Sequence, residues 1–223
     1  MIKLCIFDLD GTVLDTVQTI AYYGNYALKI NGIEEIESSK YKYFAGQGTV
    51  NLIENMLNFR NCYTKETHKK VFDDYNAAYD NDTTYKTTIF AGLKEVLDKI
   101  RELGIDFAIV SNKPDFAAKT VVKKLYGEDY FVDVIGKREK RPLKPDPTEV
   151  LDVISAQGVK KEECLYIGDT AVDMITGKNA GIYTIGVLWG FRDKEELITS
   201  GADMVIEKPS ELYDYIISKN PSV

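Results

Sequence analysis

Short apolar runs bounded by turn residues recur along the chain and form its clearest pattern. They hold three to five residues each and are rich in Val, Ile, Leu and Phe, a composition typical of strands buried on both faces. Six runs have this character: residues 3–7, 106–110, 132–135, 164–167, 183–187 and 204–206. Strands of this kind belong to sheets that are mostly parallel and covered by helices on both sides.

Segments with helical periodicity separate most of these runs. Residues 91–103 place Leu93, Val96, Leu97 and Ile100 on one face and are followed by Gly104, a favourable left-handed stop. Further helices are predicted at residues 115–126, 147–157, 171–179, 194–199 and 210–218. This alternation of strands and helices predicts an α/β fold with a doubly wound parallel sheet.

Residues 16–85 break the alternation, because they hold helix-like segments rich in Tyr and polar residues and no strand-like run. We interpret them as a helical cap domain inserted after the first strand, and residues 1–15 and 86–223 as the α/β core domain. In open α/β sheets ligands bind beyond the carboxyl ends of the strands. An insertion that leaves the first strand at that end is expected to cover the ligand site as a lid.

Composition and charge narrow the function. The net charge is -7 and the basic residues are dispersed among acids, so neither nucleic acid nor an anionic membrane is an expected partner. The basic run at residues 137–141 is short and is interpreted as a solvated loop. We expect a soluble cytoplasmic protein, since no stretch resembles a membrane span or signal peptide and the three cysteines form no CxxC pair. His68 is the single histidine, so catalysis must rest on carboxylates, Lys, Ser, Thr or a metal.

Two carboxylates directly follow the first strand. Asp8 and Asp10 are two residues apart, so in extended chain their side chains point the same way, and Gly11 allows the sharp departure that keeps them close together. An Asp-x-Asp pair alone more often marks a turn or a helix cap than a catalytic site.

A second acidic pair follows the strand at residues 164–167. Asp169 lies at the strand end and Asp173 one helical turn later, so both can face the same cation, although Asp169 or Thr170 could equally cap the helix. Carboxylate oxygens from Asp8, Asp169 and Asp173 together favour Mg²⁺ over zinc or copper.

Positive charge and hydrogen-bond donors come from two further segments. Ser111, Asn112 and Lys113 end the strand at residues 106–110, and Lys144 precedes the helix that Asp146 is expected to cap. In isolation Lys144 would be interpreted as an exposed lysine. Carboxylates, a hydroxyl group and one lysine at a single sheet edge would supply what phosphoryl transfer needs, namely positioning and charge compensation.

The order of these motifs resembles the haloacid dehalogenase superfamily. The resemblance rests on Asp8-x-Asp10-x-Thr12, Ser111, Lys144 and Gly168-Asp169-x-x-x-Asp173. Residues 7–16, 179–181 and 186–192, continuing to residues 201–203, are similar to the phosphoglycolate phosphatase-like branch. The resemblance covers nearly the whole chain, with the cap matched only loosely.

The resemblance implies a magnesium-dependent phosphatase acting on a small phosphate monoester. Asp8 would be the nucleophile that forms an aspartyl-phosphate, and Asp10 the general acid and base. Mg²⁺ would be held by Asp8, Asp169, Asp173 and the backbone carbonyl of Asp10. Lys144 would pair with Asp8 and the phosphoryl group, whose oxygens Thr12, Ser111 and the N–H of Asn112 would bind.

Substrate choice is expected to lie in the cap, because the sheet edge meets only the phosphate. Residues 44–49 are glycine-rich and resemble the family's cap loop, which makes Gly46 and Gln47 candidate substrate contacts. This loop has no Lys or Arg for a substrate carboxylate, although Lys40 and Lys42 lie nearby. Five tyrosines either line an aromatic pocket or pack inside the cap: Tyr22, Tyr23, Tyr26, Tyr41 and Tyr43.

Several other functions share parts of this pattern. A β-phosphoglucomutase-like phosphotransferase would keep all four motifs, and a pyrophosphatase or an enzyme acting on sugar phosphates or nucleotides would differ only in the cap. A dehalogenase is disfavoured because displacing halide needs no acid such as Asp10. A ligand sensor would not need both a nucleophile and an acid, and a receiver domain would not need the insertion. A monomer or a homodimer fits the sequence equally.

Overall fold

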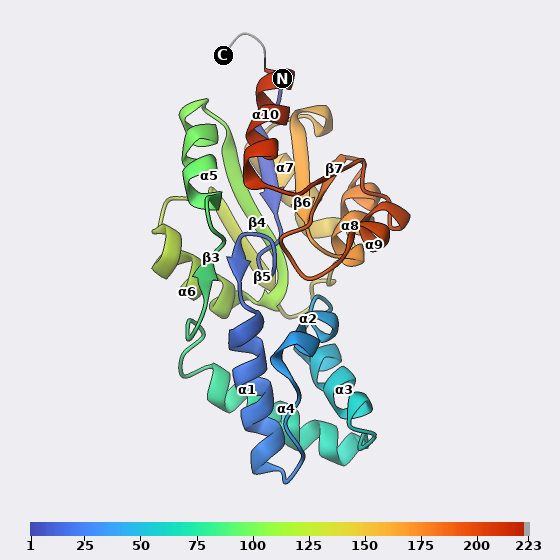
Figure 1. The fold of residues 1–223 in the computed structure, drawn as a ribbon. Helices are drawn as coiled ribbons and strands as arrows, with labels where there is room; N and C mark the ends of the chain where they lie inside the picture. The colour runs from blue at the N-terminus through green and yellow to red at the C-terminus, as the bar shows by residue number, and fades with distance from the viewer. Residues whose placement is uncertain (221–223) are drawn as a thin grey trace.

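The computed structural model describes residues 1–220 and is built around one parallel sheet (Figure 1). Its strand order is β5-β4-β1-β6-β7-β8, and every neighbouring pair is parallel. The bounds are β1 Leu4–Phe7, β4 Asp106–Pro114, β5 Asp133–Lys137, β6 Cys164–Gly168, β7 Tyr183–Val187 and β8 Met204–Ile206. The predicted doubly wound parallel sheet is therefore confirmed.

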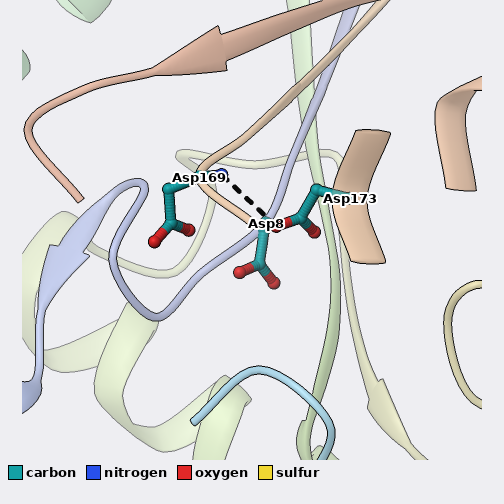
Figure 2. A group of neighbouring side chains, drawn as sticks. All are labelled: Asp8, Asp169 and Asp173. Atoms are coloured by element: carbon teal, nitrogen blue, oxygen red, sulfur yellow. Dashed lines mark hydrogen bonds between the residues drawn. The ribbon is translucent and has the colours of Figure 1, made fainter. Parts of the chain in front are cut away.

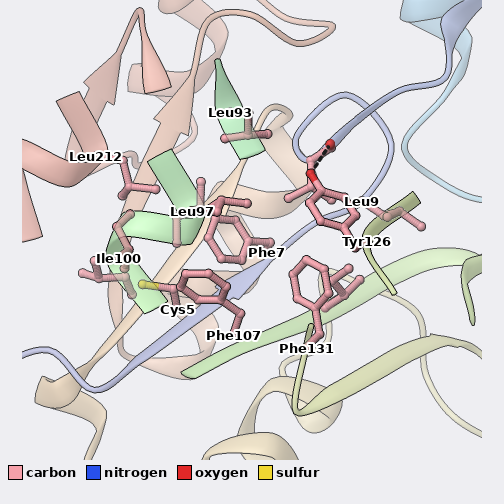
Figure 3. Packing of buried hydrophobic residues seen from close by; sticks show 14 of the residues in the cluster. Cys5, Phe7, Leu9, Leu93, Leu97, Ile100, Phe107, Tyr126, Phe131 and Leu212 are labelled. Atoms are coloured by element: carbon pink, nitrogen blue, oxygen red, sulfur yellow. Dashed lines mark hydrogen bonds between the residues drawn. The ribbon is translucent and has the colours of Figure 1, made fainter. Parts of the chain in front are cut away.

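Helices cover both faces of this sheet. They are α5 Leu93–Glu102, α6 Asp115–Tyr126, α7 Thr148–Gln157, α8 Ala171–Ala180, α9 Lys194–Thr199 and α10 Pro209–Lys219, with a short 3-10 turn at Lys161–Glu163 before β6. Cys5 and Phe7 of β1 enter the apolar layer packed against α5, α6 and α10 (Figure 3). Leu4 and Ile6 enter a second layer packed against α7. Successive side chains of a strand point to opposite faces, so a strand that is apolar at every position needs cover on both.

A separate group of helices lies beyond the carboxyl ends of the strands, below the sheet in Figure 1. It comprises α1 Val17–Ile30, a 3-10 turn at Ser38–Lys40, α2 Tyr41–Phe44, α3 Thr49–Phe59 and α4 Lys65–Tyr79. These helices enclose an apolar cluster of their own, in which Tyr41, Ile53 and Met56 are fully buried. Within residues 1–220 we find no helix with the length and apolar character that a membrane span requires.

Two short strands at the base of this group were not predicted. β2 Leu14–Asp15 and β3 Thr88–Ile89 pair antiparallel and form a two-stranded sheet where the chain enters and leaves the helical segment. A strand of two residues has too little alternation for a sequence pattern to reveal it. The pair brings both connections of the helical segment to one place.

The structure differs from the sequence interpretation at two points near the site. β4 continues to Pro114, with a shift in register between Val110 and Pro114, so Ser111, Asn112 and Lys113 belong to the strand. Helix α7 begins at Thr148 instead of residue 147, and the carboxylate of Asp146 accepts the N–H of Thr148 at 2.9 Å.

The basic run at residues 137–141 is also not simply solvated. Arg138 and Arg141 form ion pairs with Glu149 at 2.5 and 2.8 Å, which attach this segment to α7. Glu149 is 6% exposed, so the run satisfies a buried carboxylate.

Candidate active site

Three buried carboxylates meet at the carboxyl ends of β1 and β6 (Figure 2). Asp8 directly follows β1, and its backbone N–H donates to the carbonyl of Ile167 in β6 at 2.9 Å. Asp169 directly follows β6, and Asp173 lies in the first turn of α8. One oxygen from each of the three carboxylates lies within 4.8 Å of the other two. The structure thus brings together the three acidic residues that the sequence singled out.

Lys144 lies among these carboxylates and is itself buried. Its Nζ donates to Asp8 Oδ1 and to Asp173 Oδ1, both at 2.7 Å, and to the hydroxyl oxygen of Tyr166 at 3.1 Å. Burial alone would lower the pKa of Lys144, but the carboxylates of Asp173 and Asp8 outweigh it and raise this pKa, so the ammonium group stays charged. Lys144 is therefore no ordinary exposed lysine, and Tyr166 is a neighbour that the sequence did not reveal.

The carboxylates carry more negative charge than Lys144 can balance. Burial raises the pKa of Asp8 to about 6 even though Lys144 opposes the rise. Burial, followed by the charges of Asp173 and Asp8, raises the pKa of Asp169 well above its usual range. Within residues 1–220 no cationic side chain pairs with Asp169, which accepts only the hydroxyl of Thr12 and the N–H of Phe191, both at 2.8 Å.

A divalent cation fits this excess charge. Three carboxylates and one ammonium group leave two negative charges if all are ionised, and a buried carboxylate without a counter-charge is costly. The available donors are oxygens, which hard cations prefer. The three carboxylates could therefore hold a metal ion.

The start of α8 keeps Asp173 in place. Asp173 Oδ2 accepts the N–H of Thr170 at 3.0 Å and its hydroxyl at 2.6 Å in a capping box, while Oδ1 accepts from Lys144. Thr170 therefore occupies the N-cap position of α8, with its hydroxyl donating to Asp173. The same residues that start the helix also orient one carboxylate of the acidic cluster.

Two glycines allow the backbone to approach Asp169. Gly11 has a φ of +90°, and a Cβ atom there would lie 2.2 Å from Asp169 Oδ2. A Cβ atom on Gly190 would lie 2.4 Å from Asp169 Cβ. Trp189 holds the loop that follows β1 in place, because its indole N–H donates to the carbonyl of Thr12 at 2.9 Å. Residues 186–192, which the sequence marked only by resemblance, thus form one wall of the acidic cluster.

Asn112 ties together three parts of the chain. Its side-chain amide donates to the carbonyl of Gly46 at 3.1 Å and to that of Lys144 at 3.2 Å, and its Oδ1 accepts the N–H of Lys144 at 2.9 Å. These bonds position the backbone that carries Lys144 and attach the loop between α2 and α3 to the sheet. The sequence predicted only a backbone contact from Asn112 to phosphate, so the role of its side chain was missed.

A cavity of about 50 Å³ opens above Asp8, between the sheet and the helical segment. It is lined by Asp8, Asp10, Ile20, Ala45, Gly46, Gly48, Thr49, Leu52, Tyr75, Tyr79, Ser111, Asn112, Lys113 and Pro114. Of the predicted phosphate-binding and substrate-binding residues, Ser111, Asn112 and Gly46 lie in this wall.

Thr12 and Gln47 do not line the cavity. The hydroxyl of Thr12 donates to Asp169 Oδ1, so it orients a carboxylate and does not face the cavity as a phosphate ligand would. Gln47 is exposed, while Gly46 and Gly48 on either side of it line the wall. The substrate contact predicted for Gln47 therefore has no support in this arrangement.

None of the five tyrosines singled out by the sequence lines this cavity. Tyr23 and Tyr41 are buried inside the helical segment, and Tyr22, Tyr26 and Tyr43 are more than 40% exposed. The interpretation as packing residues holds for the two buried ones. The aromatic side chains of the cavity are instead Tyr75 and Tyr79 of α4, which the sequence analysis did not consider.

Arg192 attaches the loop before α3 to the sheet from the other side. Its guanidinium group donates to the carbonyls of Lys42, Tyr43 and Ala45, the last at 3.0 Å, and pairs with Glu196 at 3.2 Å. With Asn112 bound to Gly46, the loop has contacts to the sheet on two sides.

Comparison with known proteins places this arrangement among described enzymes. A family model described as haloacid dehalogenase-like hydrolase matches residues 5–187. Proteins named phosphoglycolate phosphatase are similar over almost their full length. The one from Aquifex aeolicus is 30% identical, covering 94% of both chains, and that of Vibrio parahaemolyticus is 28% identical, covering 96% of both.

Solved structures are similar as well. A crystal structure from Lactobacillus delbrueckii subsp. bulgaricus superposes with a TM-score of 0.91 and 27% identity, covering 96% of this chain and 98% of the other. A haloacid dehalogenase-like family hydrolase from Streptococcus pneumoniae superposes with a TM-score of 0.85 at 22% identity, covering 96% and 98%. The latter likeness concerns the fold alone.

Proposed function

This chain belongs to the haloacid dehalogenase-like hydrolase family and is a phosphatase of that type, and from this premise we propose that it hydrolyses a small phosphate monoester through a phosphorylated Asp8. The observation that carries the proposal is the position of Asp8. Its carboxylate lies in the cavity wall, hydrogen-bonded to Lys144 and next to Asp169 and Asp173. A nucleophile, a fixed positive charge and an acidic cluster therefore share one small volume.

The proposed reaction has two displacements. In the first, a carboxylate oxygen of Asp8 attacks phosphorus, the bond from phosphorus to the leaving oxygen breaks, and Asp10 gives that oxygen a proton. In the second, Asp10 takes a proton from water, the water oxygen attacks phosphorus, and the bond to Asp8 breaks to release inorganic phosphate. Asp10 also lines the cavity, on the side facing the helical segment, where a leaving group would lie.

We assign the acidic cluster to Mg²⁺. Asp8, Asp169, Asp173 and the backbone carbonyl of Asp10 would hold it, since they offer only oxygen donors and an uncompensated negative charge. When bound, Mg²⁺ would neutralise charge that otherwise repels an anionic phosphate. Lys144 contributes the remaining positive charge, held beside Asp8 by its bond to Asp173.

We further propose that residues 16–85 act as a cap domain over a core formed by residues 1–15 and 86–223, of which residues 221–223 lie outside the described part of the chain. Ile20, Leu52 and Tyr79 of the helical segment form one side of the cavity, while Asp8 and Ser111 of the sheet form the other. The leaving group would therefore meet the cap, as specificity requires. All these residues come from one chain, so a monomer is sufficient to form the site, and a homodimer is equally compatible with it. We propose that the protein acts in the cytoplasm.

A small leaving group fits the cavity best. Its volume of about 50 Å³ is well below the roughly 300–1,000 Å³ of typical pockets for drug-sized ligands. The names of the relatives point the same way, because phosphoglycolate is a compact ester. We therefore propose an ester of this size as the substrate.

Phosphate release from a panel of esters tests this proposal. With Mg²⁺ we expect release from phosphoglycolate to exceed that from hexose phosphates and nucleotides, and excess chelator should reduce it by about 10³-fold or more, because the cluster then repels phosphate. Unchanged release in chelator would contradict the metal assignment. No release from any ester, together with isomerisation of a sugar phosphate, would replace the phosphatase with a mutase.

The contacts of Arg192 provide a test of the cap. Arg192→Ala should free the loop before α3, lowering kcat/KM about tenfold through lost hydrogen bonds and speeding trypsin cleavage after Lys42. Arg60→Ala is the matched control, because Arg60 donates to Glu34 within the helical segment and does not line the cavity. Equal effects of the two substitutions would show that Arg192 has no special role in the cap.

A further inference from the structure

Lys113 is a buried cation in the wall of the cavity. Its side chain is 6% exposed, and its Nζ donates to the two carboxylate oxygens of Asp10 at 2.8 and 3.1 Å. Among the described residues that line the cavity, Lys113 is the only one with a positive charge. Lys144 lies deeper, where its Nζ is bonded to Asp8 and Asp173.

Packing alone does not explain a lysine here. The cavity wall also holds apolar residues, among them Ile20, Ala45 and Leu52, and a buried ion pair rarely stabilises a fold more than apolar residues of similar size. The ion pair of Lys113 and Asp10 joins β4 to the loop that follows β1, although the two residues are 103 positions apart in the sequence. The arrangement is therefore better explained by a function at the cavity than by stability.

Tyr79 of α4 presents a hydroxyl group at the same place. The Nζ of Lys113 lies 5.3 Å from the centre of the Tyr79 ring, which also lines the cavity. Among residues 1–220 no group accepts a hydrogen bond from this buried hydroxyl, and its nearest charged neighbour, the Lys113 ammonium, can only donate. Burial raises the pKa of Tyr79, with Lys113 opposing the rise, so the hydroxyl keeps its proton and remains a donor. A buried donor without an acceptor is costly unless a ligand supplies one.

We propose that Lys113 and Tyr79 form the subsite that binds a compact anionic group on the leaving alcohol of the substrate. This inference rests on the phosphatase function proposed above and extends it to the part of the ester that departs. Two donors of complementary kind would bind the anion, an ammonium group from the core and a hydroxyl from the cap. Residues 44–49 contain no Lys or Arg for this purpose, and β4 supplies a cation in Lys113.

Calorimetric binding in Mg²⁺ tests the subsite without turnover. The ligands are 3-phosphonopropionate, which carries a carboxylate, and propylphosphonate, which has a methyl group in its place. Wild-type protein should prefer the carboxylate ligand, and Lys113→Met should reduce this preference about 10- to 100-fold. Tyr79→Phe, which removes only an unpaired hydroxyl and should fold normally, should reduce it about three- to tenfold.

Tyr23→Phe is the matched control, because Tyr23 is a buried tyrosine of the helical segment whose hydroxyl donates to the carbonyl of Asp82 outside the cavity. It should leave the preference unchanged. A preference that survives both Lys113→Met and Tyr79→Phe would overturn the subsite even if the protein releases phosphate normally. A preference lost in both variants would support the subsite even if no ester is hydrolysed, an outcome that would count against the phosphatase alone.

Methylenediphosphonate separates the two sources of the anion. A larger effect of Lys113→Met on this ligand than on 3-phosphonopropionate would assign the subsite to a second phosphate group. The reverse order, which we expect from the size of the cavity, would assign it to a carboxylate.

Discussion

Asp8→Asn is expected to abolish phosphate release, lowering kcat by about 10⁴-fold or more. An amide oxygen is too weak a nucleophile to form the phosphorylated intermediate, and the other groups of the site cannot replace it. Wild-type protein quenched in acid during turnover should carry one phosphoryl group on the peptide that contains Asp8, detected by mass spectrometry. The variant should carry none.

The fold should survive this substitution. The side-chain oxygen of Asn can still accept the bond from Lys144 that Asp8 accepts at 2.7 Å, and the shape of the residue hardly changes. Asp98→Asn is the control: Asp98 pairs with Lys94 on the outer surface of α5, and its loss should leave kcat unchanged. Substantial activity in Asp8→Asn would mean that water attacks phosphorus directly, in a single displacement.

The main elements of the site could be predicted because they follow strand ends. Asp8, Ser111 and Asp169 each come after an apolar run, and parallel strands place their carboxyl ends at one edge of a sheet. Chain order and a strand pattern were thus enough to bring them together. Lys144 does not follow a strand directly, and only its place in the motif order identified it.

Contacts across the cavity could not be predicted. Lys113 and Asp10 are 103 positions apart and Tyr79 lies on a helix of the insertion, so their meeting depends on how the helical segment sits on the sheet. Nothing in local periodicity reports that placement. The same limit affected residues 44–49, where the pattern indicated a loop at the site but not that Gly46 would face the cavity and Gln47 solvent.

The carboxyl end of β4 also could not be predicted, because its residues are polar. The apolar pattern of β4 stops at Val110, although the strand continues to Pro114. The pattern stops there because the next three residues, Ser111, Asn112 and Lys113, are polar and line the cavity, so they do not join the apolar layers. Hydrophobic periodicity identifies strands by their burial in a core, so it fails where a strand is used to build a site.

The effect of Asp169→Asn on stability should change sign when Mg²⁺ is added. In chelator at pH 8 we expect the variant to unfold at a higher temperature than the wild type, by a few degrees, corresponding to about 1–2 kcal/mol. The reason is that Asp169 is a buried carboxylate beside two others, without a cationic partner among the described residues. The amide of Asn can accept the N–H of Phe191 and donate to the hydroxyl of Thr12, so both existing contacts are kept.

The dependence on pH has a definite sign. The pKa values of Asp169 and Asp8 are raised on folding, that of Asp8 to about 6, so at these two carboxyl groups the metal-free folded protein binds more protons than the unfolded chain. Their contribution to stability should therefore fall as pH rises from about 4, the ordinary value for Asp, through 6 and above. Asp169→Asn lacks one of these groups, so its advantage should be largest at pH 8 and vanish near pH 4.

Magnesium should make the wild type more stable than Asp169→Asn. A ligand at about 100 times its dissociation constant stabilises a protein by about 2.7 kcal/mol, so wild-type protein should gain several degrees in Tm, whereas the variant, with one fewer carboxylate, should gain little. Thermal unfolding with and without Mg²⁺ from pH 4 to 8 measures both effects. Asp106→Asn, which changes an exposed carboxylate at the start of β4, is the control and should follow the wild type throughout. If Asp169→Asn were the less stable protein in chelator at pH 8, the acidic cluster would not carry excess charge, and a divalent cation would have no electrostatic reason to bind there.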